Sequence, residues 1–262
     1  MKKILILTFF LTITPQLTWA YSSKFTIFSG DKKASFFSVA SGICKVFNHH
    51  YAKDGYECRA FESKGSEENL YGLAASEADF GIIKTPEFNK FFVKNFSEFE
   101  NKIEIIAKIH DEYLSILVPK NSQIKSLDNL KGKVVNIGSI GSTSALITQK
   151  YFSYFNIQTK KTVNLAASQS FKMMCDKKID AWVYFIGHPN SSFHEALEKC
   201  NLELISISST EAQNFLKIAP FLKSGVISKF FYPSLPNNIF TLSSQTILYQ
   251  TKNLLIAVAK YF

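Results

Sequence analysis

The sequence lacks any stretch of about 18 consecutive apolar residues after its first segment, so it offers no membrane-spanning helix. It contains no internal repeat at a solenoid period and no low-complexity segment. Its lysines form neither a continuous block nor a stripe interleaved with aromatic residues, so we expect no nucleic-acid partner. These absences argue against a membrane-spanning protein, a repeat protein and a nucleic-acid-binding protein.

Several catalytic motifs are missing as well. No Gly-x-Ser-x-Gly elbow is present, and the serines of Gly138-Ser139-Ile140-Gly141-Ser142 stand in the wrong places for one. No glycine-rich loop ends in Gly-Lys-Ser/Thr, as a Walker phosphate loop does. The cysteines show no Cys-x-x-Cys spacing, and the histidines stand at no ligand-like offset from them. We therefore expect no catalytic residue, no metal site and no cofactor, and a protein that is not an enzyme.

The first twenty residues have the pattern of a secretory signal peptide. Lys2 and Lys3 precede the short apolar core Ile4 to Ile13, and Thr18-Trp19-Ala20 ends the segment with a small residue. No cysteine follows at the cleavage region, so the sequence gives no support for lipid attachment. We expect cleavage near Ala20 and a periplasmic location; an uncleaved membrane anchor is the competing interpretation.

The mature chain is basic. The formal net charge is +9, and residues 1–20 hold two lysines and no acid, which leaves +7. Such a charge favours anionic small molecules or a negatively charged membrane surface. The remaining residues, about 240, suffice for one large domain or two lobes.

Four cysteines, all in the mature part, fit an oxidising compartment. Sequence alone permits three pairings. Local geometry favours Cys44 with Cys58 and Cys175 with Cys200, because in each pair an expected helix carries the first cysteine and an expected strand contains or follows the second. We expect these two disulfides rather than a metal site, in a monomeric protein.

Apolar runs of strand length alternate with segments of helical periodicity, which predicts an α/β fold with mainly parallel sheets. The change from one set of strands and helices to the next at Asp111-Glu112-Tyr113, with a return near Ser208-Ser209-Thr210, predicts two lobes, 21–112 plus 208–262 and 113–207. The expected strands are 25–29, 56–61, 78–83, 103–110, 113–119, 134–137, 181–186 and 202–207. The expected helices are 35–51, 67–76, 144–155, 168–178, 193–200 and 254–261.

Polar, glycine-containing turns follow several of these strands and lead into helices. In an α/β fold, ligands bind where a strand ends and a helix begins. The apolar strand Ala181 to Ile186 runs into Gly187-His188-Pro189-Asn190, and turns of the same kind occupy 63–66 and 138–143. Several such turns predict one binding cleft, which favours a binding protein over an enzyme.

Four segments, in this order, resemble the TAXI family of TRAP-transporter solute receptors over nearly all of the mature chain. They are Gly65-Ser66 with Asn69, Ile124 to Lys133, Asn136 to Ser142, and Gly187-His188-Pro189-Asn190. The resemblance implies a two-lobed, type II periplasmic-binding-protein-like fold that closes over a small ligand. It also implies a glutamate-like or other carboxylate solute, anionic or zwitterionic, and delivery to TRAP membrane subunits.

Backbone N–H groups at helix N-termini and nearby hydroxyls can hold a carboxylate without a dedicated cation. Lys64 is either a direct carboxylate partner or a solvated loop lysine. The imidazole of His188 either holds its own turn by hydrogen bonds or faces the cleft. The expected ligand-binding residues are Ser29, Gly30, Ser63, Lys64, Gly65, Ser66, Asn69, Asn136, Gly138, Ser139, Ser142, Thr143, Tyr184, Gly187 and His188.

The chain departs from the family pattern at several points. Phe36-Phe37 replaces paired tyrosines, Asp31 would repel an anion, and Ile140 and Thr143 stand where proline and glycine are usual. Family members also continue beyond the expected helix 254–261, so we expect a shortened first lobe and lower stability than a longer relative. An exported ligand sensor without a transporter, or a degenerate remnant that binds nothing, are the alternatives to a transport receptor.

Overall fold

The computed structural model describes residues 23–30, 32, 35–94 and 99–252. The expected signal peptide with its cleavage near Ala20, and the expected helix 254–261, lie outside these residues. The first elements are β1 (Ser23–Phe28), α1 (Ser35–Tyr51), η1 (Ala52–Asp54), β2 (Tyr56–Phe61), α2 (Ser66–Ala74), β3 (Phe80–Lys84), α3 (Thr85–Lys94) and β4 (Ile103–Pro119). They are followed by η2 (Leu127–Leu130), β5 (Val134–Asn136), α5 (Thr143–Tyr154), β6 (Lys161–Val163), α6 (Ala167–Cys175), β7 (Ala181–Ile186) and α7 (Ser191–Lys199). The last are β8 (Leu202–Leu204), α8 (Ser209–Leu216), β9 (Lys223–Ile227), η3 (Lys229–Phe231) and β10 (Ile239–Thr251).

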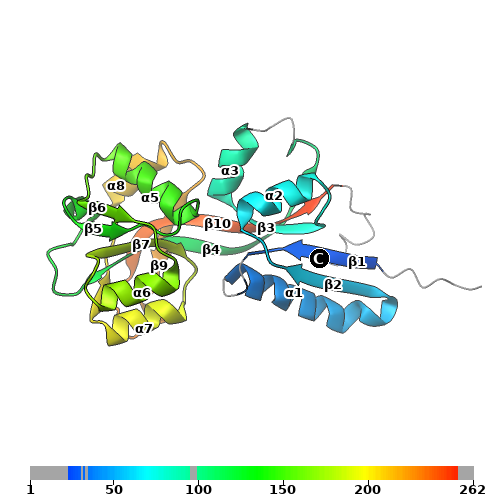
Figure 1. The fold of residues 1–262 in the computed structure, drawn as a ribbon, viewed down its shortest axis with the longest axis horizontal. Coiled ribbons are helices and arrows are strands. Elements are labelled where there is room, and N and C mark those ends of the chain that lie inside the picture. The colour runs from blue at the N-terminus through cyan, green and yellow to red at the C-terminus, as the bar shows by residue number, and fades with distance from the viewer. Residues whose placement is uncertain (1–22, 31, 33–34, 95–98, 253–262) are drawn as a thin grey trace, which may run out of the picture.

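The strands of the described residues form one mixed sheet that extends through two lobes (Figure 1). Its main order is β2-β1-β3-β10-β4-β7-β5-β6, with β8 against β4 and β9 against β10. The outer strands pair in parallel, β1 with β2 and β3, and β5 with β6 and β7. All pairs that involve β4 or β10 are antiparallel. The α/β fold is therefore confirmed, whereas the mainly parallel character holds for the outer strands only.

Two long strands, β4 and β10, run from one lobe into the other (Figure 1). They pair with each other from Ile103 opposite Thr251 to Tyr113 opposite Ser243. The sequence suggested two strands separated at Asp111-Glu112, but β4 is continuous through these residues. These acidic residues are tolerated inside the strand because Asp111 pairs with Lys108 and Glu112 pairs with Lys84.

Each lobe has helices on both faces of its part of the sheet (Figure 1). In α1, buried Phe36, Ala40, Cys44 and Phe47 recur every three or four residues and therefore lie on one helix face. This face packs against β1 and β2, while α2 and α3 cover the opposite side. In the other lobe, α5 and α8 cover one face and α6 and α7 the other.

The chain returns to the first lobe later than the sequence suggested. We expected the return near Ser208-Ser209-Thr210, but Ala212, Phe215 and Leu222 pack in the core of the second lobe. Strand β9 also pairs with the first part of β10, over Ile239 to Ser243. The apolar face of α8 is buried against this core, and β9 pairs with the first part of β10, so the return takes place within β10.

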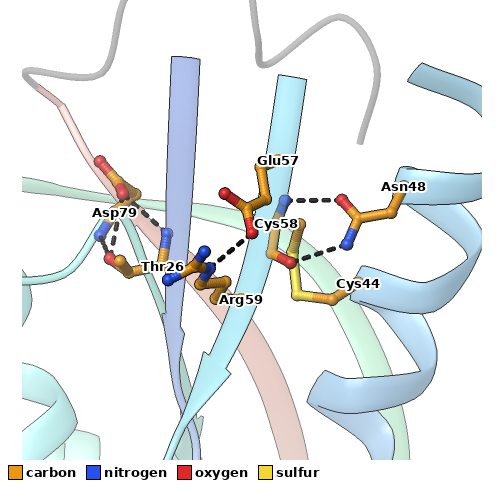
Figure 2. The surroundings of a disulfide bond; sticks show 7 residues. All are labelled: Thr26, Cys44, Asn48, Glu57, Cys58, Arg59 and Asp79. Carbon is orange, nitrogen blue, oxygen red and sulfur yellow. Dashed lines mark hydrogen bonds and ion pairs between the residues drawn. A yellow bond between two sulfur atoms is a disulfide. The ribbon is translucent and has the colours of Figure 1, made fainter. Parts of the chain in front are cut away.

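Both expected disulfides are confirmed. Cys44 of α1 is bonded to Cys58 of β2, with Cα atoms 4.9 Å apart. Beside this bond, the Asn48 side chain donates to the carbonyl of Cys58 at 2.9 Å and accepts from its N–H at 2.7 Å (Figure 2). Cys175 and Cys200 join the C-terminal ends of α6 and α7, with Cα atoms 5.0 Å apart. Each lobe thus has one covalent link between neighbouring elements.

Candidate ligand-binding site between the lobes

Buried and half-buried polar side chains from both lobes meet next to the crossing strands. We name Lys84, Glu87, Glu112 and Thr143 the inter-lobe cluster. Lys84 ends β3, and Glu87 lies in the first turn of α3, which begins at once because a proline is tolerated at a helix start. Glu112 lies within β4, and Thr143 is the first residue of α5 in the second lobe. The cluster therefore joins β3, α3 and the crossing strand β4 to α5 of the second lobe.

The cation of the cluster is paired. Lys84 Nζ lies 2.7 Å from Glu112 Oε2, and Glu112 is almost completely buried. His110 Nε2 lies 3.8 Å from the other carboxylate oxygen, and the Phe36 ring centroid is 5.2 Å from Lys84 Nζ. An aromatic face at this distance also favours the ammonium. Phe36 thus favours the charged form of the lysine.

The electrostatics of the Lys84–Glu112 pair follow from its burial and mutual attraction. Burial alone would lower the pKa of Lys84, but the charges of Glu112 and Glu87 raise it above its ordinary value. Burial alone would raise the pKa of Glu112, but the charge of Lys84 and the neighbouring His110 lower it below its ordinary value. Both groups are therefore charged at neutral pH.

Glu87 makes one contact between the lobes. Its Oε1 accepts a hydrogen bond from the Thr143 hydroxyl. Burial raises the pKa of Glu87, against the opposing effects of the Lys84 charge and the Thr143 hydrogen bond. A second contact lies nearby: Thr85 Oγ1 accepts from the N–H of Gln245 at 3.2 Å and donates to the carbonyl of Phe221 at 3.3 Å. The start of α3 is thus tied to the second lobe at two points.

An open cavity of about 230 Å³ lies between α3 and α5. Small-molecule pockets are commonly larger, from about 300 Å³, so this cavity suits a compact solute. It begins one helical turn beyond Glu87 on α3 and just beyond Thr143 on α5. Its lining includes Lys90, Ile140, Gly141, Ala145, Gln149 and Asn164. Lys90 is the residue that the first lobe contributes to this lining, and the other lining residues belong to the second lobe.

The expected contacts at the first turn have structural partners. Ser29 is fully buried, and its hydroxyl donates to the carbonyl of Phe61 at 2.8 Å. Both amide hydrogens of buried Asn69 are used, on the carbonyls of Ser29 at 2.8 Å and Ile82 at 2.7 Å. Gly30 is buried and lies against the side chain of Phe36 in α1. Ser29 and Asn69 therefore hold β1, β2 and β3 together, and their donors are not available to a ligand.

The second turn, 63–66, shapes the start of α2. The Ser63 hydroxyl accepts from the N–H of Gly65 at 3.1 Å, and Gly65 has φ of 109°, a conformation that favours glycine. The Ser66 hydroxyl accepts from the N–H of Lys84 at 3.1 Å, which links this turn to the inter-lobe cluster. The side chain of Lys64 is exposed, as a solvated loop lysine would be.

Polar groups in and around the third turn, 138–143, are also engaged in hydrogen bonds within the protein. Asn136 is fully buried, and its Oδ1 accepts from the N–H groups of Gly138 at 3.2 Å and Leu165 at 2.9 Å. Ser142 caps α5, with its hydroxyl accepting from a backbone N–H of the first turn at 3.2 Å. Ser139 is partly exposed and precedes the residues that line the cavity. Ile140 and Gly141 of this turn line part of the cavity, together with residues from the start of α5.

His188 holds its own turn. Its Nε2 lies 2.7 Å from Ser115 Oγ and its Nδ1 lies 2.5 Å from Tyr232 Oη. Ser115 Oγ donates to the carbonyl of Tyr113, so it accepts from Nε2–H; Tyr232 Oη accepts from the N–H of Asn190 and donates to Nδ1. This pattern requires a neutral imidazole, and burial lowers the pKa of His188 to about 4. Of the two interpretations from sequence, the structural one fits.

Three further expected residues lie at or near the inter-lobe cluster. Thr143 belongs to it. Tyr184 is close enough for Lys84 and Glu112 to influence its pKa, which burial raises. Gly187 lies beside His110, whose Cδ2 would be 3.4 Å from an added Cβ.

Sequence reasoning missed Lys84, Glu87, His110 and Glu112. Two signals were present. Ile83-Lys84-Thr85-Pro86-Glu87 is itself a strand-to-helix turn, like those that were recognised. The pair Asp111-Glu112 interrupts an apolar run and was interpreted as a boundary between lobes, although an acidic residue in a strand can also mark a buried partner.

Other site types find no support among the residues that the structure describes. No group of three or more His, Cys, Asp or Glu side chains is placed to hold a metal ion there. Within the same residues, no helix combines the length and apolar character that a membrane span requires.

Residues 28–256 match the family model described as the NMT1-like family. The chain belongs to the NMT1-like family. The matched range contains the four segments that resemble the TAXI receptors.

Solved structures place the NMT1-like chain among proteins of known fold. The periplasmic aliphatic sulphonate-binding protein of Escherichia coli is 16% identical, with a TM-score of 0.50, over 70% of this chain and 60% of that protein. The substrate-binding protein of an amino acid ABC transporter is 14% identical, with a TM-score of 0.52, over 91% and 89% of the two chains. The regulatory domain of a LysR-family regulator from N. meningitidis is 8% identical, with a TM-score of 0.56, over 91% and 89%.

These likenesses establish the fold of this NMT1-like protein. It has the two-lobed α/β architecture of type II periplasmic binding proteins, as expected from the sequence. The chain spans less than two thirds of the length of the sulphonate-binding protein. The same fold serves transport proteins and a regulatory domain, so function has to be argued from the site.

Proposed function

We propose that this protein is an exported, monomeric solute-binding receptor that captures a small carboxylate-bearing solute between its lobes. It delivers the solute to membrane transport subunits, of TRAP type if the resemblance to TAXI receptors extends to the partner. The observation that carries the proposal is the hydrogen bond between Glu87 and Thr143, next to a cavity lined from both lobes. A solute in this place contacts both lobes at once.

The chain passes between the lobes within β4 and β10. Movement of one lobe relative to the other therefore depends on these two strands. A ligand that contacts both lobes favours the closed arrangement, because only there does it make all of its contacts. A transport subunit that recognises the closed form then receives loaded receptors in preference to empty ones. This accounts for a binding protein without catalytic residues.

Donors for a carboxylate are available around the inter-lobe cluster. Lys84 has further N–H groups besides the one directed to Glu112, and the start of α5 adds backbone N–H groups with the positive end of its helix dipole. The Tyr184 hydroxyl, whose raised pKa keeps it protonated, is a further donor. One protein of similar fold binds aliphatic sulphonates, and another is the substrate-binding protein of an amino acid transporter. A small charged solute is consistent with both.

Native mass spectrometry of freshly purified protein, followed by thermal-shift assays with organic acids and amino acids, tests the proposal. A bound small acid, or stabilisation of about 2.7 kcal/mol at a ligand concentration near 100 times Kd, is expected. Neither a co-purified solute nor a shift with any compound of the panel would indicate a remnant that no longer binds.

An exported ligand sensor is the second candidate, because a regulatory domain shares the fold. Both functions use the same cleft, so ligand binding alone does not separate them. Uptake of the labelled solute by cells that carry or lack the gene does: a receptor for transport is needed for uptake, whereas a sensor is not.

A further inference from the structure

Exposed apolar side chains gather at the β9–β10 hairpin, residues 223–240. Ten large apolar side chains are exposed among the residues that the structure describes, and four of them lie in this hairpin: Val226, Phe230, Phe231 and Phe240. Phe230 is 87% exposed. Single apolar residues are ordinary on a protein surface, whereas a group of them marks a surface that contacts another body.

The strand pairing places two of these side chains on an outer face. Ile227 pairs with Ile239, and both are buried in the core of the second lobe. The next pair of the ladder is Val226 with Phe240. Successive side chains of a strand point to opposite faces, so Val226 and Phe240 form an apolar cross-strand pair on the other face of the hairpin.

The connection between β9 and β10 is anchored so that the two phenylalanines of η3 stay outside. Tyr232 follows them and is buried, with its hydroxyl bonded to His188. The N–H of Lys229, which precedes them, donates to Asn238 Oδ1 at 3.0 Å. Because both flanking residues are held by hydrogen bonds, the exposure of the phenylalanines is a property of the folded hairpin.

The hairpin is also cationic. Residues 212–262 contain five lysines and neither Asp nor Glu. Lys223 and Lys229 are exposed, and neither takes part in an ion pair within the described part of the chain. Lys229 Nζ lies 5.5 Å from the centroid of the Phe230 ring. A cation and an aromatic ring are therefore neighbours on this surface.

Acids on neighbouring elements have partners of their own. Glu195 of α7 pairs with Lys199, and Glu203 of β8 pairs with Lys125. Glu211 belongs to the capping box at the start of α8. The hairpin thus keeps its positive charge, which favours an anionic occupant. A second copy of the chain would bring the same lysines together, and like charges oppose that contact.

We propose that the β9–β10 hairpin is a membrane-contacting surface, on which the protein rests against a lipid bilayer with anionic headgroups. Phe230 and Phe231 enter the boundary between headgroups and acyl chains, and Lys229 contacts lipid phosphate. Aromatic rings and lysines are the side chains that proteins place at this boundary. The net positive charge of the chain favours the same occupant.

This contact goes beyond the proposed receptor function, because it needs neither the cavity nor a solute. A transport subunit that recognises the closed receptor has to contact both lobes, whereas the hairpin belongs to the second lobe alone. A bilayer imposes no such requirement. Contact with lipid keeps the receptor beside its membrane subunits whether or not it carries a solute.

Flotation with lipid vesicles tests the contact. The protein, purified as cells export it, is mixed with vesicles of phosphatidylcholine alone or of phosphatidylcholine with phosphatidylglycerol. It should float with the anionic vesicles and not with the neutral ones. Raising the salt concentration from about 0.01 M to about 1 M shortens the screening length from about 30 Å to about 3 Å, so binding should weaken strongly.

Variants assign the contact to the hairpin. Phe230→Ser should weaken vesicle binding about tenfold, because a large apolar side chain no longer leaves water. Lys229→Gln should weaken it about fivefold at low salt. Val46→Ser and Lys45→Gln are the matched controls, since this exposed apolar residue and its neighbouring lysine lie on α1 of the first lobe. Both controls should bind vesicles as the unmodified protein does, and all four variants should unfold at its midpoint.

A fluorescent side chain reports the contact directly. Phe230→Trp should show a blue shift of its emission with anionic vesicles and quenching by brominated lipid. Val46→Trp should show neither. The native Trp182 is fully buried, so its emission is a constant background in both variants.

Each remaining result overturns the proposal. The first is that the protein does not bind anionic vesicles, and the second is that Val46→Ser weakens binding as much as Phe230→Ser does. Binding to cell membranes but not to pure lipid, if Phe230→Ser abolishes it, identifies a membrane protein as the occupant instead. A dimer in analytical ultracentrifugation that Phe230→Ser dissociates identifies a second copy. Thermal-shift assays with solutes, run on the same variants, test the receptor function separately, so either proposal can fail while the other stands.

Discussion

Lys84 Nζ lies 2.7 Å from Glu112 Oε2, although β10 runs between the two strands that carry these residues. Within β10, Thr246 is opposite Lys84 and Ser244 is opposite Glu112. The long lysine side chain thus spans one strand to reach its partner. Because β4 and β10 are the strands that cross between the lobes, this ion pair links β3 to the segment where β4 passes from one lobe to the other.

Removing one partner of this pair should be costly. Lys84→Met leaves the carboxylate of Glu112 buried and unpaired, so we expect the free energy of unfolding to fall by about 3–5 kcal/mol at pH 7. Lys84→Met combined with Glu112→Leu should recover most of this loss, because neither charge of the pair is then left without its partner. Urea unfolding measures both. A double variant as unstable as the single one would contradict the explanation.

The pH dependence of the pair has a defined sign. The pKa of Glu112 is lowered on folding, so its contribution to stability is present above the ordinary value of 4.5 and is lost as pH falls through the lower folded value. The pKa of Lys84 is raised, so its contribution is present below 10.5 and is lost as pH rises through the higher folded value. The difference between unmodified protein and double variant should follow this profile.

His188 should weaken the protein as pH falls. Its pKa is about 4 in the folded protein against 6.5 ordinarily, so its stabilising effect is complete above pH 6.5 and is lost toward pH 4. Between pH 7.5 and 5.0 this amounts to about 2 kcal/mol. Unfolding at both pH values should show a correspondingly smaller decrease for His188→Gln. An imidazole that titrates near 6.5 in NMR spectra would contradict the buried hydrogen-bonded arrangement.

The two disulfides should act on separate lobes. Each closes a short loop, with sequence separations of 14 and 25 residues, and should contribute about 3 kcal/mol in the loop-entropy model. Replacing Cys44 and Cys58 by alanine should raise hydrogen exchange mainly in α1 and β2. Replacing Cys175 and Cys200 should raise it mainly in α6 and α7. Equal effects of either replacement on both lobes would mean that the lobes unfold as one unit.

Two glycines of one turn offer a matched comparison. Gly138 has φ of 89°, and an added Cβ would lie 2.8 Å from the Cβ of Ser144. Gly141 has φ of 80°, with no atom within 4 Å of an added Cβ. Gly141→Ala should therefore cost only backbone strain, about 1 kcal/mol. Gly138→Ala should cost about 1–3 kcal/mol more, because it adds a steric clash. Thermal or urea unfolding of the two variants checks the difference, and equal costs would contradict it.

Local patterns in the sequence predicted much of the fold. The stripe of apolar residues from Phe36 to Phe47 predicted α1 with the bounds that the structure shows. The expected strands 56–61 and 181–186 have the bounds of β2 and β7, and the cysteine positions predicted both disulfides. These features depend on neighbours a few residues apart, which a sequence displays directly.

Strand β10 was missed for a physical reason. It is central and almost entirely buried, yet it contains polar residues such as Thr241, Ser244 and Thr246. It therefore shows neither an apolar run nor an alternating pattern. What makes it a strand is its pairing with β3, β4 and β9, which lie far away along the chain.

The sequence by itself determined the helices with clear apolar faces, the strands with clear apolar runs, and the cysteine pairs, since short-range periodicity and loop geometry control them. Only the tertiary structure decided which polar residues meet between the lobes. Lys84 and Glu112 belong to strands separated in the sheet by β10, and Glu87 meets Thr143 from the other lobe. The crossing of β4 and β10 brings these groups together, and no spacing rule along the chain encodes such a contact.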